Sequence, residues 1–269
     1  MSIVIAIANQ KGGVGKTTTA INLGAALGAL EKRVLLVDCD PQGNATRGLG
    51  EQASPPHLYH VLVGDAPASR AVRPTSFSGL SLLPSDRELV GVEVEFVGSE
   101  EWERRLRTAL HDVIDAFDYV FLDCPPSLGH LTVNALAAAD RLLVPLQCEY
   151  FALEGISELV ATVRRVQTRI NPPLQIGGVI LTMFDERTNL SREVAEEARR
   201  HFPGLVYDAM VPRNIRLAEA PSHGLPILQY DIKSKGAEAY LRSPASFSGG
   251  RHERSKARVG ARSRCPSGQ

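Results

Sequence analysis

Short apolar runs alternate along the chain with longer segments in which apolar residues recur at helical spacing. The runs are rich in Val, Ile and Leu, which is typical of strands buried on both faces of a parallel sheet. Strands are predicted at residues 3–8, 34–38, 119–123, 142–146, 176–183 and 206–211, with a shorter one near Leu80. Helices are predicted over 16–30, 58–64, 101–117, 131–137, 153–170 and 191–201. This alternation predicts an α/β fold with a mostly parallel sheet.

A glycine-rich loop follows the first apolar run and precedes the first predicted helix. It reads Gln10-Lys11-Gly12-Gly13-Val14-Gly15-Lys16-Thr17-Thr18. Backbone N–H groups of such a loop and the helix N-terminus favour negative charge, so the segment predicts a phosphate site. Lys16 is expected to reach the β- and γ-phosphates, and the Thr17 hydroxyl is expected to bind Mg²⁺.

The loop departs from the ordinary P-loop pattern G-x-x-x-x-G-K-[ST] in one position. Gln10 stands where the first glycine is expected, and a second lysine, Lys11, follows it. A single phosphate chain need not use both lysines from one subunit. The alternative is an inert glycine turn in which Lys11 is a solvated charge.

Acidic residues end two of the predicted strands. Asp38 and Asp40 follow the second strand, where Pro41 and Gly43 predict a turn, and Asp123 ends the strand at 119–123 in a Walker B pattern. The carboxyl edge of an open α/β sheet is where ligands bind. One carboxylate of the first pair could hold a metal-bound water and the other could orient the attacking water. Asp123 is expected to contact Mg²⁺ through water, and the alternative for Asp40 is an Asx-turn that caps the next helix.

Composition limits the classes of function. The 269 residues are 43% hydrophobic and 22% charged with a formal net charge of zero, so any contact with DNA must come from a local patch. No apolar run approaches the length of a membrane span, and no room for a signal peptide is expected before the first strand. Cys39, Cys124, Cys148 and Cys265 show no metal-binding spacing, which predicts buried thiols in a cytosolic protein.

Five segments together resemble the ParA/Soj family of chromosome- or plasmid-partitioning ATPases. They are KGGVGKTT at 11–18, VLLVDCDPQGN at 34–44, FLDCPPS at 121–127, QCEYFALEG at 147–155 and VPRNIRLAEAPSHG at 211–224. The resemblance covers residues 2 to 241. It implies one P-loop ATPase domain at 1–241 with a deviant Walker A motif, a doubly wound sheet and helices on both faces. It also implies slow, Mg²⁺-dependent ATP hydrolysis.

The resemblance assigns roles to individual residues. Lys11, Lys16 and Asp40 are the implied catalytic residues: Lys11 reaches across a dimer to the partner's phosphates, and Asp40 positions the hydrolytic water. The implied nucleotide contacts are Lys11, Gly12, Gly13, Val14, Gly15, Lys16, Thr17 and Thr18 at the phosphates, with Pro212 and Asn214 at adenine. Thr17, and Asp123 through water, would hold the metal, and Arg187 and Arg216 would contact DNA, with solvated surface charges as the alternative for these two.

The resemblance also implies a cycle in which the bound nucleotide decides how long the protein stays on DNA. ATP and Mg²⁺ are the expected cofactors, and an ATP-bound homodimer is expected to bind double-stranded DNA without sequence preference. A centromere-binding partner of the ParB/Spo0J type stimulates hydrolysis and releases the dimer. A cytoplasmic, nucleoid-associated protein without membrane attachment is expected. The alternatives are a MinD-like membrane-associated positioning ATPase and a nucleotide-dependent scaffold with little catalysis.

The family pattern ends at Leu241. Residues 242–269 carry seven basic residues and one acid, against 23 basic and 29 acidic residues in the preceding 241. With almost no apolar periodicity, this tail is expected to be disordered. It is either a basic tail that adds DNA affinity or the product of out-of-frame translation.

Overall fold

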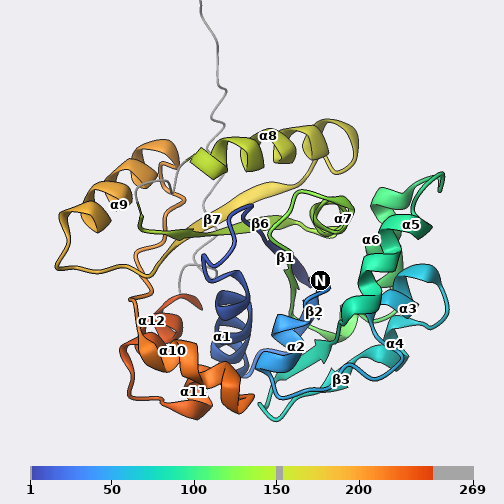
Figure 1. Cartoon of the computed structure of the whole chain (residues 1–269), viewed down its shortest axis with the longest axis horizontal. Helices are drawn as coiled ribbons and strands as arrows, with labels where there is room; N and C mark the ends of the chain where they lie inside the picture. Colours follow the sequence, from blue (N-terminus) through green and yellow to red (C-terminus); the bar gives the residue numbers. More distant parts are fainter. Residues whose placement is uncertain (1, 150–153, 245–269) are drawn as a thin grey trace, which may run out of the picture.

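The computed structural model of the chain describes residues 2–149 and 154–244. In this part, a seven-stranded sheet has the order β3-β4-β2-β5-β1-β6-β7, and every pairing is parallel except that of β3 with β4. The strands are β1 (Ile3–Ile7), β2 (Val34–Asp38), β3 (Arg73–Pro74), β4 (Leu80–Leu83), β5 (Tyr119–Asp123), β6 (Arg141–Gln147) and β7 (Gln175–Thr182). The predicted, mostly parallel α/β sheet is therefore confirmed (Figure 1).

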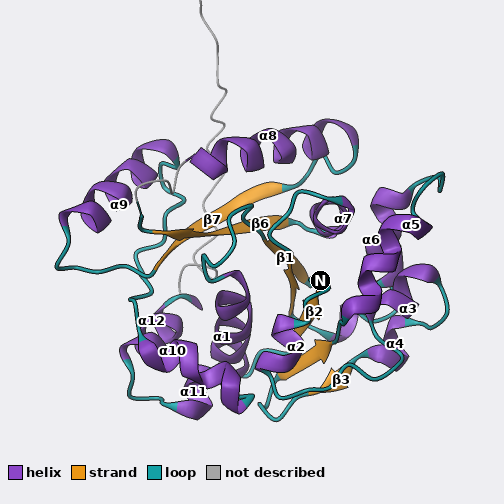
Figure 2. Cartoon of the chain, in the orientation of Figure 1, coloured by secondary structure: helices purple, strands orange, loops and turns teal. Residues whose placement is uncertain are grey.

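Helices cover both faces of the sheet, which confirms the doubly wound arrangement (Figure 2). One face packs against α1 (Lys16–Ala29), α2 (Asn44–Gly48), α10 (Ile215–Glu219), η4 (Ala220–His223), α11 (Ile227–Tyr230) and α12 (Lys235–Arg242). The other face carries α3 (Leu58–Val63), α4 (Ala68–Ala71), η1 (Arg87–Gly91), α5 (Val92–Glu95), η2 (Trp102–Arg104), α6 (Arg105–Ala109), η3 (Ile114–Ala116), α7 (His130–Ala138), α8 (Glu154–Arg169) and α9 (Asn189–His201).

Each central strand sends alternate side chains to the two faces. In β1, Val4 and Ala6 enter the core under α3–α9, whereas Ile5 and Ile7 enter the core under α1 and α10–α12. Both sets are buried, because successive side chains of a strand point in opposite directions and both faces are covered. This explains why the strands read as unbroken apolar runs.

The helix predicted over 101–117 is wrong as a single element. The segment forms η2, α6 and η3 in succession, although Leu106, Leu110 and Val113 are buried as the apolar spacing predicted. Asn134 of α7 accepts a hydrogen bond from the backbone N–H of Leu106 at 3.0 Å. A side chain from another helix therefore satisfies a donor at the start of α6, and the chain can turn there without one continuous helix.

The strand predicted over 206–211 is also wrong. The segment hydrogen-bonds to β7 near its two ends, from Tyr207 N to Val179 O at 2.9 Å and from Val211 N to Leu181 O at 2.8 Å, and forms only isolated bridges. Asp208 between these ends is exposed to solvent. A solvated acid in the middle of the run separates the two points of pairing.

Three of the four cysteines confirm the prediction of buried thiols. Cys39, Cys124 and Cys148 are free and buried, each directly after a strand or in the loop that follows it. Cys265 and nearly all of the basic tail lie outside the described residues. Across the described residues, no helix combines the length and hydropathy that a bilayer crossing requires.

Candidate nucleotide site

The glycine loop lies at the carboxyl end of the sheet, where three strands bring their terminal residues together. In the strand register, Asp123 at the end of β5 is paired with Ile7 of β1 on one side and with Asp38 of β2 on the other. The loop leaves the end of β1, which lies next to β5 in the sheet, and enters α1 (Figure 1). The topology therefore places the phosphate loop beside both acidic strand ends, as the sequence predicted.

Two glycines give the loop its shape. Gly13 has φ +72° and Gly15 has φ +87°, which is the left-handed region that other residues rarely adopt. Gly15 accepts the hydrogen bond from Thr19 N at 2.8 Å, so the helix begins directly after it. The first turn of α1 consists of one lysine and three threonines, and its backbone N–H groups face the loop as donors for an anion.

Two polar side chains outside the motif fix the loop in place. Asn9 donates to the carbonyl of Pro145 at 2.8 Å and accepts from Lys11 N at 3.0 Å. Thr182, at the end of β7, donates to the carbonyl of Val14 at 2.8 Å. Sequence reasoning did not single out Asn9 or Thr182, because the carbonyls to which they donate, those of Pro145 and Val14, are distant from them in the chain.

The two lysines of the loop have different environments. Lys16 is buried, and its Nζ donates to the carbonyl of Lys11 at 3.1 Å. Burial lowers the pKa of Lys16, while the nearby Asp123 carboxylate opposes that shift. Lys11 is partly exposed, and its Nζ lies 3.6 Å from Oε2 of Glu149. Only Lys16 is therefore directed into the loop of its own chain.

The two aspartates after β2 have different uses. Asp38 is fully buried and accepts hydrogen bonds from Asp40 N at 3.2 Å, Thr46 N at 2.8 Å and Thr46 Oγ1 at 2.7 Å. The predicted alternative for Asp40 is present only in part: α2 has Gly43 at its N-cap and no side-chain cap, so an Asx-turn at Asp40 does not cap that helix. Within this Asx-turn, the Asp40 carboxylate accepts from Gln42 N at 2.9 Å. This turn leaves Asp40 Oδ2 without a partner among the hydrogen bonds of the described residues. Asp38 is thus structural, and Asp40 is the carboxylate with capacity for a water.

Asp123 is the buried acid whose contacts are incomplete. Neither of its carboxylate oxygens has a hydrogen-bond partner among the described residues, although both are buried. Burial raises the pKa of Asp123 well above its usual range, the Asp38 carboxylate adds to the shift, and Thr17 and Lys16 oppose it. A buried, unpartnered carboxylate beside a threonine hydroxyl is a donor set of the kind that Mg²⁺ prefers, since it binds oxygen ligands and keeps several waters. The residues therefore fit the predicted metal, which would lower the charge of the phosphates and orient them when bound.

The two predicted adenine residues lie together on the loop before α10. Pro212 is half-buried and bridges to Phe184, and it lines a groove of about 1010 Å³ with Arg187 and Arg213. Asn214 caps α10, because its Oδ1 accepts from Arg216 N at 2.8 Å. The amide nitrogen of Asn214 is left as a donor for a ligand.

The two arginines predicted for DNA are exposed, but each is paired with carboxylates of its own chain. Arg187 forms two hydrogen bonds to Asp185, at 2.9 and 2.8 Å. Arg216 lies 2.9 Å from Glu219 and 3.6 Å from Asp231. A DNA phosphate would have to compete with these acids.

A mostly parallel sheet in which β1 leads through a two-lysine glycine loop into a helix, at the edge where β5 and β2 end in acids, defines a P-loop ATPase of the deviant Walker A type. A family model described as "AAA domain" matches residues 2–176. The chain is 54% identical over 243 residues to the sporulation initiation inhibitor protein Soj of Bacillus subtilis, which covers 90% of this chain and 96% of that protein. It is also 54% identical to the chromosome partitioning protein ParA of Caulobacter vibrioides, over 89% of this chain and 91% of that one. The chain belongs to the ParA/Soj family of partitioning ATPases, which confirms the resemblance found in its sequence.

Solved structures share the fold. One described as cobyrinic acid a,c-diamide synthase of Mycobacterium smegmatis, with a bound ATP analogue and magnesium, is 39% identical with a TM-score of 0.81, over 90% of this chain and 92% of that one. The cell division ATPase MinD of Pyrococcus furiosus is 27% identical with a TM-score of 0.77, over 92% and 99% of the two chains. These structures are in keeping with the predicted cofactors, ATP and Mg²⁺.

Proposed function

We propose that this partitioning ATPase works as an ATP-dependent DNA-binding switch. Two subunits join face to face across bound ATP, and the dimer binds double-stranded DNA without sequence preference on the nucleoid. A ParB/Spo0J-type partner stimulates hydrolysis, and the dimer then dissociates. The family supports the partitioning activity, and the residues described above support the individual steps.

The environment of Lys11 is the observation that carries the proposal. Lys16 is buried and directed into the loop of its own subunit, whereas the Lys11 ammonium is partly exposed and, among the described residues, is held only by an ion pair with the partly exposed Glu149. Exposed pairs of this kind contribute little, so Lys11 can exchange Glu149 for a phosphate of a second subunit at small cost. A phosphate is a stronger partner, because it carries more charge and accepts several hydrogen bonds.

The remaining residues of the site fit slow hydrolysis that depends on positioning. Phosphoryl transfer needs charge neutralisation and orientation of water rather than covalent help. Lys16 and the loop N–H groups would bind the β- and γ-phosphates, and Thr17 with Asp123 would hold Mg²⁺. Asp40 would orient the attacking water, and Lys11 of the partner subunit would complete the charge around the γ-phosphate. Loss of that phosphate removes what joins the subunits.

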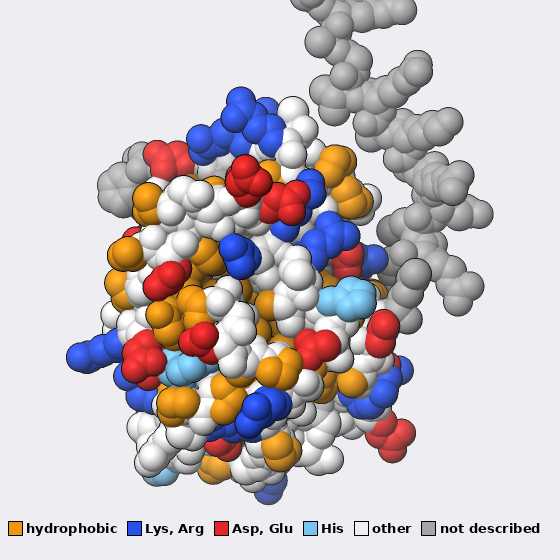
Figure 3. Space-filling view, turned by 90° about the vertical axis from the view of Figure 1, so that its right-hand side faces the viewer, with side chains coloured by type: hydrophobic (Ala, Val, Ile, Leu, Met, Phe, Trp, Pro, Cys, Tyr) orange, Lys and Arg blue, Asp and Glu red, His pale blue; other side chains and the backbone are white. Residues whose placement is uncertain are grey.

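DNA binding is proposed for the side of the molecule that carries Arg187 and Arg216. Dimerisation would double the basic residues presented to one DNA, and nonspecific affinity rises steeply with the number of phosphates neutralised. The opposite side, with α3 to α6, mixes charges of both signs with apolar side chains and offers no uniform basic surface (Figure 3). Charge-reversing variants Arg187→Glu and Arg216→Glu should weaken DNA binding in the ATP state while ATP hydrolysis without DNA is retained.

The decisive experiment is light scattering of Lys11→Ala with ATP, compared with the wild type and with the control Lys32→Ala, which removes an exposed lysine between α1 and β2, away from the loop. We expect the wild type and the control to dimerise with ATP and the Lys11→Ala variant to remain monomeric while still binding ATP. Unchanged dimerisation of Lys11→Ala would remove the cross-subunit role. Flotation with liposomes tests the MinD-like alternative, and binding to vesicles in the ATP state would favour it.

A further inference from the structure

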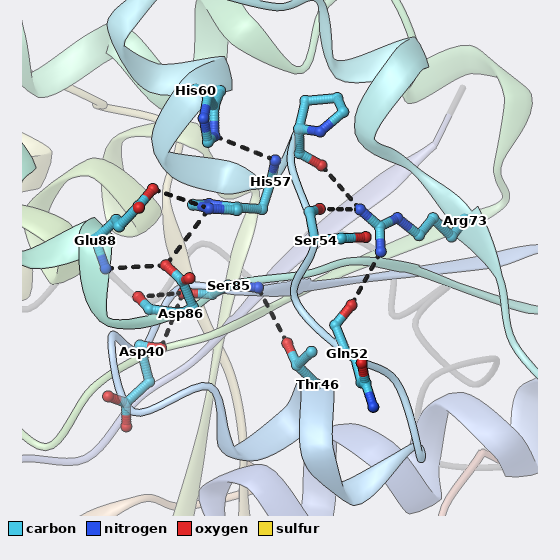
Figure 4. A network of polar contacts seen from close by, with 11 residues as sticks. Asp40, Thr46, Gln52, Ser54, His57, His60, Arg73, Ser85, Asp86 and Glu88 are labelled. Atoms are coloured by element: carbon cyan, nitrogen blue, oxygen red, sulfur yellow. Dashed lines mark hydrogen bonds and ion pairs between the residues drawn. The ribbon is translucent and has the colours of Figure 1, made fainter.

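A second cluster of ligating side chains lies outside the nucleotide site, between the start of α3 and η1. His57 immediately precedes α3, His60 lies within it, and Asp86 and Glu88 lie at the start of η1. Ligand atoms of His57, His60 and Glu88 all lie within 4.8 Å of one another. In Figure 4 the His57 ring points between the carboxylates of Asp86 and Glu88.

His57 is the residue whose chemistry is unexplained. Its side chain is 1% exposed, and neither ring nitrogen has a hydrogen-bond partner in the described part of the chain. A buried imidazole with two unsatisfied nitrogens is costly, so such a group calls for a partner. Its Nε2 lies 3.3 Å from Glu88 Oε2 and 3.5 Å from Asp86 Oδ1.

The distance between His57 Nε2 and Glu88 Oε2 matches the spacing of two ligands around a tetrahedral metal ion. Nitrogen and oxygen ligands at about 2.0–2.1 Å from a tetrahedral zinc ion lie about 3.3 Å from each other. His57 and Glu88 already have that separation, and Glu88 is exposed, so its carboxylate can rotate without disturbing the core.

From this geometry we propose that His57, His60 and Glu88 form a site for a divalent transition metal, with Zn²⁺ as the reference ion and with Asp86 beside it as the N-cap of η1. Two imidazoles with a carboxylate favour zinc and its neighbours over Mg²⁺ and Ca²⁺, which prefer oxygen ligands alone. The site is distinct from the nucleotide site, because its ligands come from other elements.

The ion would join α3 to the segment that supports Asp40. Ser85, next to Asp86, donates from its hydroxyl to the Asp40 carbonyl at 3.1 Å and from its N–H to Thr46 Oγ1 at 3.0 Å. Figure 4 shows this continuous line of contacts from His57 through Asp86 and Ser85 to Asp40. The bound metal would therefore restrain the turn that holds the proposed water-positioning carboxylate.

The test is zinc titration of the full chain without nucleotide, in competition with a chromophoric chelator. His60→Gln and Glu88→Gln remove ligands from half-buried and exposed positions, and His111→Gln, an exposed histidine on the same side of the sheet, is the matched control. We expect the wild type and His111→Gln to bind one equivalent more tightly than either ligand variant, by at least about tenfold. Zinc should also raise the melting temperature of the wild type more than that of Glu88→Gln.

Comparison among variants removes the contribution of thiols elsewhere in the chain, which are the same in all four proteins, and His111→Gln measures the effect of losing a histidine outside the proposed site. Equal zinc affinity and stoichiometry in all four would overturn the site, and so would the absence of any tightly bound equivalent in the wild type. If His60→Gln does not fold, the exposed Glu88→Gln keeps the test decisive.

Discussion

The ion pair between Lys11 and Glu149 gives a quantitative prediction about dimerisation. If Lys11 must leave Glu149 to reach the partner's phosphate, then Glu149→Gln removes a contact that stabilises only the monomer. Both side chains are partly exposed, 39% for Lys11 and 44% for Glu149, and the atoms are 3.6 Å apart. Such pairs contribute about 0.2–1 kcal/mol.

Two of these pairs break in each dimer, so the variant should favour dimerisation by about 0.4–2 kcal/mol. This corresponds to a dimer dissociation constant lowered by about twofold to thirtyfold in ATP. The effect should shrink as salt rises, because exposed pairs are screened. Glu149 also lies 3.4 Å from Arg213, so Arg213 loses this ion pair in the variant as well.

The assay is sedimentation of the ATP-bound protein over a concentration series at two salt concentrations. Glu196→Gln is the control, because it removes an ion pair of similar length, 3.7 Å from Arg200 on α9, between more exposed side chains and without touching the loop. A weaker dimer in Glu149→Gln would refute the reasoning, since it would show that Glu149 contributes to the dimer rather than restraining Lys11.

Two further predictions concern the aspartates after β2. Asp40→Ala should slow ATP hydrolysis by about 100-fold or more, because the water loses its positioning carboxylate, and should prolong residence of the ATP dimer on DNA; normal hydrolysis in a single-turnover assay would contradict the assignment. Burial raises the pKa of Asp38 to about 6 in the folded chain, against an ordinary value of 3.8. The folded state therefore keeps this proton at pH values where the unfolded state has released it, so the free energy of unfolding falls by about 2 kcal/mol as pH rises from 4 to 7. Asp38→Asn should lack this loss of stability. If urea unfolding without Mg²⁺ gives both proteins the same dependence of the free energy of unfolding on pH, the prediction is wrong.

The sequence predicted the parts of the fold and site that depend on neighbouring residues. Continuous apolar runs marked β1, β2, β5, β6 and β7 because strands covered on both faces need no polar positions. The phosphate loop could be predicted for the same reason, since its glycines, lysines and threonines lie close together in the chain. The predicted strand at 206–211 failed because hydrophobicity alone does not reveal an exposed acid that interrupts pairing with β7.

Residues that act on the loop from distant parts of the chain were not predicted. Asn9 and Thr182 fix the loop through carbonyls of Pro145 and Val14, and such backbone partners leave no pattern in side-chain type. Glu149 does lie in the segment QCEYFALEG that supported the family resemblance, so a signal was present there. Its pairing with Lys11 depends on how β6 is placed beside β1, which only the tertiary structure defines.

The unpartnered carboxylate of Asp123 provides a test that separates function from stability. A buried carboxyl group without hydrogen bonds costs stability in the metal-free chain whether it is charged or must take up a proton, so Asp123→Asn should raise the free energy of unfolding by about 1–3 kcal/mol without nucleotide. The same variant should lose the additional stabilisation that Mg²⁺ gives in the presence of ADP, which for a ligand at 100 times its Kd is about 2.7 kcal/mol. Thermal unfolding with ADP in Mg²⁺ or in chelator measures both effects.

Asp118→Asn is the control for this test, because Asp118 immediately precedes the same strand, pairs with Arg33 at 3.1 Å and lies at the opposite edge of the sheet. It should lose a little stability and keep the full response to Mg²⁺. A purely structural Asp123 would instead make Asp123→Asn less stable and leave the Mg²⁺ response intact. If Asp123 destabilises the fold but binds the metal, Asp123→Asn should be more stable than the wild type without Mg²⁺ and should not be further stabilised by Mg²⁺.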